Sequence, residues 1–599
     1  MIMVKIDMHL CSMCLINVDA FLKREQSIRQ GKRVDRQAKV LEFGDDEVTE
    51  YVILSHRWIE QEVDYNEVVK LAKMDEEERS EICQRDGYRK ILESCEQAKK
   101  DGYKWLWIDT CCIDKRSSAE LSEAINSMYR WYKNSAMCYA YLHNLASSSF
   151  PIVGDDERYP DSRGWLEWFS CGWMLQEMIA PQNVQFFNKD WHPIGDKRTL
   201  SLILENITHI PQHILNEGLS SNRPCVAQIM SWAADQMTTR VEDRAYSLMG
   251  LLDVNMPMLY GEGKKAFHRL QLEIIHMSND HSIFAWGCNK IKVQNGSILA
   301  DDPSFFQDCD KMELMDQDKF IESVRGGVPE EELPSIEDDQ LGTFLVTNRG
   351  IQIWLFLCSA GSDSVFEARL PCRSRPLGPY VAINLALWES NYYRYTPSDH
   401  EEWRLQLCHI YLRYQDMPQF CNATFELDDT AILEKGFTSS DMWSEGLIIG
   451  NMIILSTTDP LCVVRYSCSQ EYDFTLGFGQ CFGQNWIYVE EEFDMISESP
   501  YDLMEVTAPE HAQSMKEIQF GAASLHYGNP SPWILRTSCV MWKSSRLCGV
   551  KLEVFQDPGF GDVSGEWTGF DIDVSKFFLC MHITISLVTV YTGNRGFQP

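Results

Sequence analysis

The sequence predicts an α/β domain built on a parallel sheet, followed by a mainly β domain. In the first half, short runs that are apolar on both faces alternate with helical patterns, as strands inside a parallel sheet do. The second half shows many strand patterns and few helical periods. At 599 residues the chain is too long for one hydrophobic core, so we expect about two to four domains.

The composition excludes several classes of partner. There are 88 acidic and 54 basic residues, which gives a net charge of −34. Phosphate binding needs clustered Lys and Arg, so we expect no nucleic-acid partner, and a negative chain is also repelled by anionic membranes. No secretory signal opens the chain, so we expect its 21 cysteines to stay reduced and the protein to be cytoplasmic.

One local pattern suggests a metal site but lacks the spacing of one, and another suggests a membrane span but is too short. Cys11 and Cys14 form one Cys-x-x-Cys pair, but the second pair or two His that zinc needs about 12–20 residues further on do not follow. We therefore expect no metal. The apolar run 577–591 is shorter than the roughly 20 residues that span a bilayer, and its β-branched content predicts a strand.

The first half alternates strands and helices. Strands are predicted at 39–43, 51–54, 105–108, 137–142 and 184–187, and helices at 87–100 and after a capping box of Ser117 and Glu120. Strands 51–54, 105–108 and 137–142 should be parallel neighbours with helices on both faces. A helical extension follows at 224–234, 242–252 and 262–277. Within it, 261–265 lacks the spacing of a phosphate loop and predicts a turn.

Polar residues follow two of these strands directly. Ser55, His56 and Trp58 come after the first, and Asp109 comes after the second. Open α/β sheets bind ligands beyond the carboxyl ends of their strands, so these side chains are candidate binding residues. The alternative for His56 is a structural histidine with satisfied hydrogen bonds.

A later segment adds a carboxylate. If residues 170–177 are helical, Trp173, Gln176 and Glu177 stand at i, i+3 and i+4 and share one face. A carboxylate beside an indole in apolar surroundings suits a flat cationic ligand. The alternative is an ordinary amphipathic helix, with Trp173 in the core and Glu177 solvated at its edge.

After an acidic region, the helical patterns of the first half give way to strand patterns. We predict domains at 1–285 and 341–599, with residues 286–340 as a linker or boundary between them. A hairpin is predicted around Asn348, Arg349 and Gly350. Further strands are predicted at 380–387, 447–455, 461–466, 486–489, 550–555 and 576–591. The pattern favours a β-sandwich or a barrel-like domain.

Several motifs, in this order, resemble those of the fungal heterokaryon-incompatibility (HET) domain. They are Tyr51–Trp58, Trp107–Asp114, Arg163–Trp165 and Gly172–Glu177, and segments like Arg240–Gly250 and Tyr260–Gly263 commonly follow them. The resemblance covers roughly residues 40–285. This sequence departs from the pattern at Met174, where a small polar residue is common.

The resemblance implies a role in non-self recognition and programmed cell death. HET domains resemble TIR domains, which implies a TIR-like, flavodoxin-like sheet. In TIR domains that cleave NAD, the glutamate at the place of Glu177 is catalytic. The resemblance therefore implies an NAD glycohydrolase (NADase) in which NAD is substrate rather than cofactor. In such an enzyme we expect substrate-binding roles for Ser55, His56, Trp58, Asp109, Trp173 and Gln176, and we also expect self-association on activation and a protein partner in recognition.

The sequence is compatible with three functions. Cleavage of the nicotinamide–ribose bond leaves positive charge on the ribose, which one carboxylate can stabilise because nicotinamide leaves neutral. A non-catalytic TIR-like signalling or oligomerisation module would use Trp173 and Glu177 only in its core or interface. A thiol hydrolase would use Cys111 or Cys112 with His56 as base.

Overall fold

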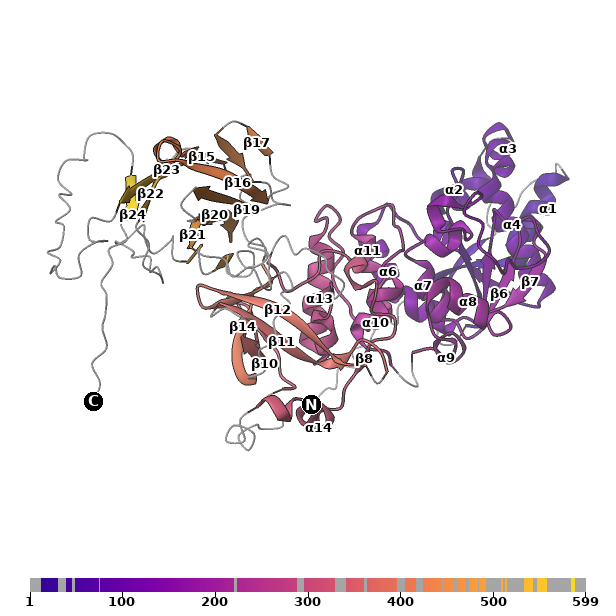
Figure 1. Ribbon diagram of the computed structural model, residues 1–599. Helices are drawn as coiled ribbons and strands as arrows, with labels where there is room; N and C mark the ends of the chain where they lie inside the picture. Colours follow the sequence, from indigo (N-terminus) through magenta and orange to yellow (C-terminus); the bar gives the residue numbers. More distant parts are fainter. Residues whose placement is uncertain are drawn as a thin grey trace, which may run out of the picture. The chain divides into compact units, whose positions relative to one another are not determined.

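Figure 1 shows the fold of the chain as a computed structural model. The structure describes residues 12–30, 39–45, 49–74, 76–219, 223–287, 296–328, 341–359, 364–376, 378–395, 405–415, 424–443, 447–449, 451–455, 461–468, 473–482, 484–491, 508–509, 512–513, 533–541, 547–556 and 583–587. Cys11 of the Cys-x-x-Cys pair lies outside them.

The N-terminal sheet has seven strands in the order β2-β1-β4-β3-β5-β6-β7. The strands are β1 (Ser12–Asn17), β2 (Leu41–Asp45), β3 (Val52–His56), β4 (Trp105–Trp107), β5 (Met137–Tyr141), β6 (Val184–Phe187) and β7 (Pro193–Asp196). β4, β3, β5 and β6 run parallel, which confirms the predicted parallel neighbours. β1, β2 and β7 pair antiparallel, so the sheet is mixed.

Helices flank this sheet (Figure 1). They are α1 (Val18–Arg29), α2 (Tyr65–Lys70), η1 (Leu71–Lys73), α3 (Glu76–Gln84), α4 (Asp86–Lys100), α5 (Asp109–Cys112), α6 (Ser118–Asn134), η2 (Pro160–Ser162), η3 (Glu167–Ser170) and α7 (Met174–Ile179). β4 and β5 lie on opposite sides of β3, so right-handed crossovers place α4 and α6 on opposite faces. All five residues of β3 are buried, as a strand covered on both faces requires.

Two local predictions need correction. The first 50 residues hold a complete strand and helix, β1 and α1, where the sequence pattern suggested little beyond one short strand. Ser117 caps α6 by accepting the N–H of Glu120 at 3.3 Å, but the capping box is not reciprocal. The Glu120 carboxylate instead accepts the N–H of Asp114, because the N–H of Ser117 already bonds the Asp114 carbonyl.

A helical extension follows the sheet. It contains α8 (Ser201–Thr208), α9 (Gln212–Glu217), α10 (Val226–Trp232), α11 (Asp243–Tyr246), α12 (Met249–Leu252), α13 (Lys265–Met277), η4 (His281–Phe284) and η5 (Pro303–Phe306). The predicted helix at 242–252 is therefore two short helices. Gly261 and Gly263, with φ of 104° and 61°, form a turn whose N–H groups donate to the Glu242 carboxylate at 2.8 and 3.0 Å. An internal carboxylate thus takes the place that a phosphate would have in a phosphate loop.

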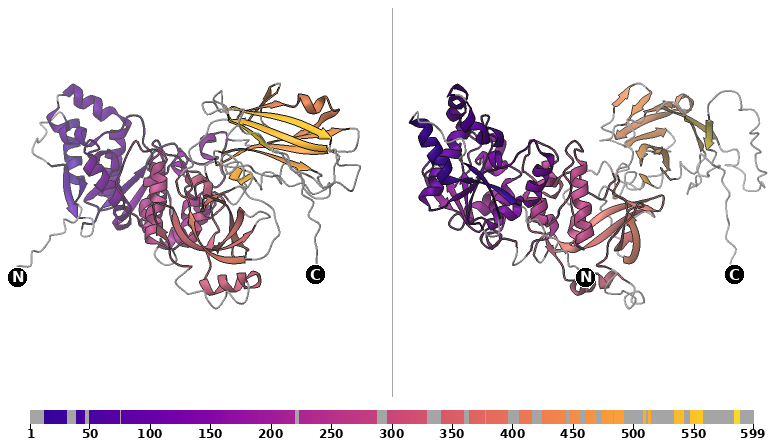
Figure 2. Two further views of the ribbon diagram at one scale, coloured as in Figure 1. Left: turned by 90° about the vertical axis from the view of Figure 1, so that its left-hand side faces the viewer. Right: turned by 180° about the vertical axis from the view of Figure 1, so that it is seen from behind.

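The second half consists mostly of β-sheets, as predicted (Figure 2). One sheet, of order β8-β11-β12-β13-β14-β10-β9, contains β8 (Glu313–Leu314), β9 (Leu345–Val346), β10 (Ile351–Ser359), β11 (Val365–Arg373), β12 (Tyr380–Trp388), β13 (Asn391–Arg394) and β14 (Leu405–Leu412). The predicted hairpin is the antiparallel pair of β9 and β10. Two short helices, α14 (Gln317–Val324) and η6 (Arg325–Gly327), lie between β8 and β9 in the chain.

Two further sheets share one hydrophobic core. The first, of order β17-β18-β15-β23-β22-β24, contains β15 (Thr424–Asp428), β17 (Leu447–Ile449), β18 (Met452–Ile454), β22 (Trp533–Met541), β23 (Leu547–Gln556) and β24 (Ile583–Leu587). The second, of order β16-β19-β20-β21, contains β16 (Phe437–Trp443), β19 (Leu461–Cys468), β20 (Asp473–Cys481) and β21 (Gln484–Glu491). A short helix, α15 (Thr430–Leu433), precedes β16. Phe425 of β15 and Phe478 of β20 meet in the common core, with ring centroids 5.5 Å apart. The predicted strand 447–455 is an antiparallel pair, β17 and β18.

The chain divides into two compact units. One comprises Met1–Asn289, Leu299–Gln317 and Leu370–Val381, and the other Lys290–Ile298, Asp318–Arg369 and Ala382–Pro599. The predicted borders near 285 and 340 stay predictions, since 288–295 and 329–340 are outside the described residues. Among the described helices, none combines the length and apolarity needed to cross a bilayer.

Candidate functional site

The site begins at Ser55, near the carboxyl end of β3. Its hydroxyl is fully buried and accepts the indole N–H of Trp168 at 2.9 Å. The same hydroxyl donates to Oε2 of Glu177 at 2.5 Å. An indole N–H can only donate, so the single hydroxyl proton of Ser55 is directed at Glu177. Trp168 of η3 thereby helps to orient Ser55 against the carboxyl group of α7.

Glu177 is partly buried, and its surroundings favour the neutral acid. Burial raises the pKa of its carboxyl from the ordinary value of 4.5 to about 8, against the hydrogen bond from Ser55. The charge of Asp109 adds to the rise, and a hydrogen bond from Tyr132 opposes it. A positive charge placed nearby would favour the ionised carboxylate, so this group is sensitive to a cationic ligand.

His56 lies beside two carboxylates without bonding to either. Its Nε2 is 3.7 Å from Oε1 of Glu62 and 3.7 Å from Oδ1 of Asp109, and its side chain is 1% exposed. In the described part of the chain neither ring nitrogen has a hydrogen-bond partner of good geometry. Burial, followed by the charges of Lys90 and Lys115, holds the pKa of His56 well below its usual value. The neutral ring has one N–H, which the Leu54 carbonyl attracts, and one acceptor nitrogen.

A buried ion pair supports His56 from α4. Lys90 is 2% exposed, and its Nζ lies 2.5 Å from Oε1 of Glu62. Burial lowers the pKa of Lys90, while the contact with Glu62 acts in the opposite direction. Breaking such a pair would leave an uncompensated charge in the interior, so Glu62 and Lys90 hold each other in place.

Asp109, the first residue of α5, connects this interior to the surface. Its Oδ2 accepts the indole N–H of Trp58 at 2.7 Å. Lys115 approaches the same oxygen at 3.9 Å and lies over the Trp58 ring, with Nζ 3.6 Å from the centroid. Trp58 is 53% exposed, so an aromatic face held by charged groups stands at the edge of the cluster.

Five of the seven predicted site residues therefore meet in one cluster: Ser55, His56, Trp58, Asp109 and Glu177. The other two have different surroundings. The indole of Trp173 hydrogen-bonds the carboxylate of Asp243 in the helical extension. Gln176 is 1% exposed, and its Nε2 has no hydrogen-bond partner among the described residues.

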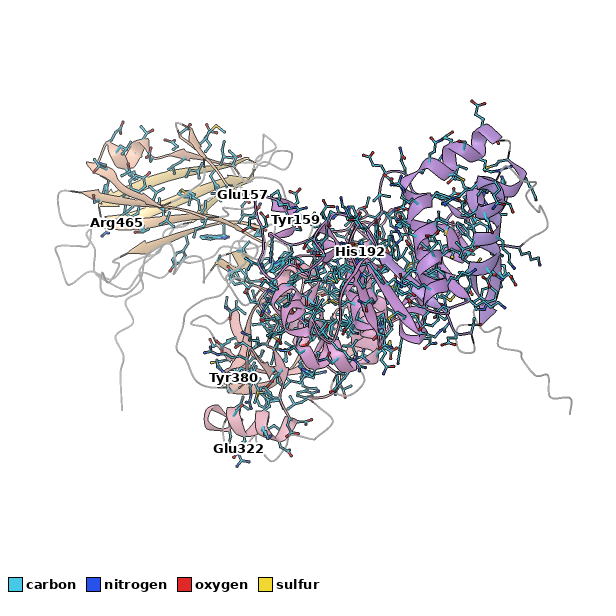
Figure 3. All side chains as sticks on the ribbon, turned by 90° about the vertical axis from the view of Figure 1, so that its right-hand side faces the viewer. Glu157, Tyr159, His192, Glu322, Tyr380 and Arg465 are labelled. Carbon is cyan, nitrogen blue, oxygen red and sulfur yellow. The ribbon has the colours of Figure 1, made fainter. Side chains whose placement is uncertain are left out.

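Sequence reasoning missed several members of the cluster. His143 follows the carboxyl end of β5, and its charge acts on His56, so the strand-end pattern that found His56 and Asp109 also applied to it. Burial lowers the pKa of His143. Glu62, Lys90, Tyr132 and Trp168 carry no such local signal. Trp168 lies on the long connection after β5, which also carries Tyr159, labelled in Figure 3. The Tyr159 hydroxyl donates to the Asn144 carbonyl at 3.4 Å.

The residue types in the cluster favour one class of reaction over another. No group of three or more His, Cys, Asp or Glu suited to a metal ion occurs within the described ranges. Cys111 and Cys112 are buried, and burial raises the pKa of the Cys112 thiol well above its usual value. A thiolate nucleophile needs the opposite shift, so the geometry favours carboxylate chemistry over thiol chemistry.

Comparison with known proteins identifies part of the chain. Residues 51–163 match the family model described as "Heterokaryon incompatibility protein (HET)". The chain is also 42% identical over 231 residues to "Vegetative incompatibility protein HET-E-1" of Podospora anserina. That match covers 37% of this chain and 16% of the length of the relative.

The family match contains most of the cluster. Ser55, His56, Trp58 and Asp109 lie inside residues 51–163, whereas Glu177 lies beyond them. The sequence motifs at 51–58 and 107–114, and the strands that carry them, lie in this stretch. The chain therefore carries a heterokaryon-incompatibility (HET) domain, matched at residues 51–163.

Proposed function

We propose that this HET-domain protein hydrolyses NAD at the nicotinamide–ribose bond and acts as a cell-death effector in non-self recognition. One observation carries the proposal: the Glu177 carboxyl is bonded to Ser55 and lies within the field of Asp109 at the carboxyl edge of a parallel sheet. The resemblance to TIR domains that cleave NAD supports the same role for this glutamate. The name of the relative supports a function in incompatibility.

The reaction needs a negative charge beside the ribose. As the bond from ribose to the ring nitrogen breaks, its electron pair leaves with nicotinamide and positive charge develops on the sugar. A carboxylate at Glu177 stabilises that charge. Water then adds to the ribose carbon and releases a proton, for which Glu177 and the neutral ring of His56 are acceptors. The products are nicotinamide, ADP-ribose and one proton.

The ionisation of Glu177 depends on whether the cationic substrate is bound. With a pKa of about 8, the group is mostly neutral near pH 7 in the free protein. The nicotinamide ring of NAD is cationic, and a cation beside Glu177 favours ionisation. The substrate would thus help to generate the charge that its own cleavage needs, while a free site keeps its carboxyl neutral.

The test is nicotinamide release by the purified full chain. We expect the wild type to release nicotinamide from NAD, and Glu177→Gln to be slower by about 10²–10³, the usual effect of losing one preorganised electrostatic group. Glu205→Gln is the matched control. Glu205 is also a half-buried carboxylate, accepting a hydrogen bond from Gln212 at 2.6 Å on α8. Full activity in Glu177→Gln would remove Glu177 from the mechanism.

A non-catalytic signalling or oligomerisation module is the second candidate. The burial that raises the pKa of Glu177 favours it, since a carboxyl group packed against Ser55 and Tyr132 is also a good structural group. This function would rest on self-association and on a protein partner. If the wild type releases no nicotinamide even when fused to a domain that forces it to oligomerise, the signalling module replaces the enzyme.

A further inference from the structure

Trp58 is an exposed aromatic residue, and the side chain of Lys115 covers one face of its ring. The ring is held by its N–H, which donates to Asp109 at 2.7 Å. The Lys115 ammonium covers the ring at 3.6 Å from its centroid and is 3.9 Å from Oδ2 of Asp109. Trp58 nevertheless stays 53% exposed, so it is not a core residue.

This arrangement is that of a binding site for a cation. The face of an indole carries negative potential and attracts positive groups within about 6 Å. The Asp109 carboxylate adds a full negative charge at the ring edge. Lys115 satisfies both features at once, as a cationic ligand would. Its side chain is 32% exposed and belongs to the connection between α5 and α6, so it can move into water without unpacking the core.

We infer that Lys115 is an internal competitor for the Trp58 face, and that the ligand which displaces it is a flat aromatic cation. Within the proposed function, on which this inference rests, that cation is the nicotinamide ring of oxidised NAD. Asp109 links the two places, since it bonds Trp58 and also acts on Glu177.

Trp58 and Asp109 make the site selective for ring charge, whereas Lys115 must leave for either ring and, once displaced, repels only a cationic one. A cationic ring recovers the attraction to Trp58 and Asp109 that is lost when the ammonium leaves. A neutral ring, such as reduced nicotinamide, recovers only the stacking contact. Trp58 and Asp109 therefore favour the oxidised dinucleotide over the reduced one, and Lys115 holds back the binding of the oxidised ring until it is displaced.

Binding of two small probes to the full chain tests this inference. 1-Methylnicotinamide, which is methylated on its ring nitrogen, carries the ring charge and has no ribose to cleave, and nicotinamide is its neutral counterpart. We expect Lys115→Met to bind the cation about two- to five-fold more tightly by calorimetry, the fold-change that corresponds to an exposed cation–aromatic contact. Affinity for neutral nicotinamide should change less. Lys133→Met, at an exposed lysine in the last turn of α6, should behave as wild type.

A second variant keeps the test decisive. Trp58→Leu should lose binding of the cation whether Lys115 is present or not. The inference is overturned if Lys115→Met leaves the affinity for the cation unchanged, if both probes gain equally, or if the cation binds Trp58→Leu as it binds the wild type. None of these measurements depends on cleavage. A gain for the cation in a protein that releases no nicotinamide would therefore contradict the proposed reaction and leave the role of Lys115 standing.

Discussion

Ser55 and Glu177 are 122 positions apart in the chain and are joined by a hydrogen bond of 2.5 Å. Ser55 is the next-to-last residue of β3, in the parallel part of the sheet, and Glu177 lies on α7, which precedes the parallel strand β6. The bond lowers the pKa of Glu177, while burial raises it more strongly. The chemical state of the carboxyl is therefore a balance that single substitutions can shift.

The protonation of Glu177 should appear in the pH dependence of stability. Its pKa is higher in the folded chain than the unfolded value near 4.5, so its stabilising protonated form is complete below about 4.5 and is lost as pH rises through about 8. Glu177→Gln removes this loss. The variant should gain stability relative to the wild type as pH rises from about 5 to about 8, by a few kcal/mol at most, since each pKa unit is worth about 1.4 kcal/mol. Urea unfolding at both pH values measures it, and a constant difference between the two proteins would contradict the shifted pKa.

Ser55→Ala should move the pH profile of nicotinamide release. The substitution removes a hydrogen bond that lowers the pKa of Glu177, so the rise of activity with pH should shift to higher pH than in the wild type. It also leaves the buried N–H of Trp168 without its acceptor, which costs about 1–3 kcal/mol. Ser94→Ala is the control, because Ser94 is equally buried but bonds only carbonyl groups of its own helix. An unchanged profile in Ser55→Ala would separate Ser55 from the titration of Glu177.

Gly87→Ala should destabilise the cluster from the side of α4. A Cβ at position 87 would lie 2.4 Å from the carbonyl oxygen of Gln61 and 2.7 Å from Cα of Glu62. Both are backbone atoms of the segment that presents Glu62 to His56 and Lys90, so we expect a loss of about 1–3 kcal/mol in thermal or denaturant unfolding. Gly326→Ala, where the added Cβ meets nothing within 4 Å, should be neutral. Equal unfolding midpoints for Gly87→Ala and wild type would contradict this close approach.

Limited proteolysis should cut near Gly326 to Glu332. The acidic run that follows Pro329 predicts a boundary between domains, and such boundaries are the usual sites of cleavage. Mass spectrometry of the early fragments locates the cuts. Cleavage concentrated within 242–277 would contradict the division, because Glu242 bonds the turn at Gly261 and Gly263, and Arg269 pairs with Glu262 at 2.6 Å.

Much of the first sheet could be predicted from the sequence. The runs that became β3, β4, β5 and β6 are short and apolar on both faces, and helices separate the first three. This pattern has few solutions other than parallel strands with right-handed crossovers. The same logic placed Ser55, His56 and Asp109 at one edge of the sheet, and the structure puts them there. β1 was not predicted, because a single short apolar run shows no regular alternation of strands and helices around it.

Only the tertiary structure decided which side chains of the site contact one another. The sequence by itself determined which strand ends carry polar groups, because strand direction and helix period follow from local patterns. It did not determine that Trp168 orients Ser55, that Lys90 pairs with Glu62, or that Lys115 covers Trp58. These contacts join residues whose spacing in the chain follows no helix or strand period. They depend on how the connections after β3 and β5 pack, and that packing is set by the whole core rather than by any local segment.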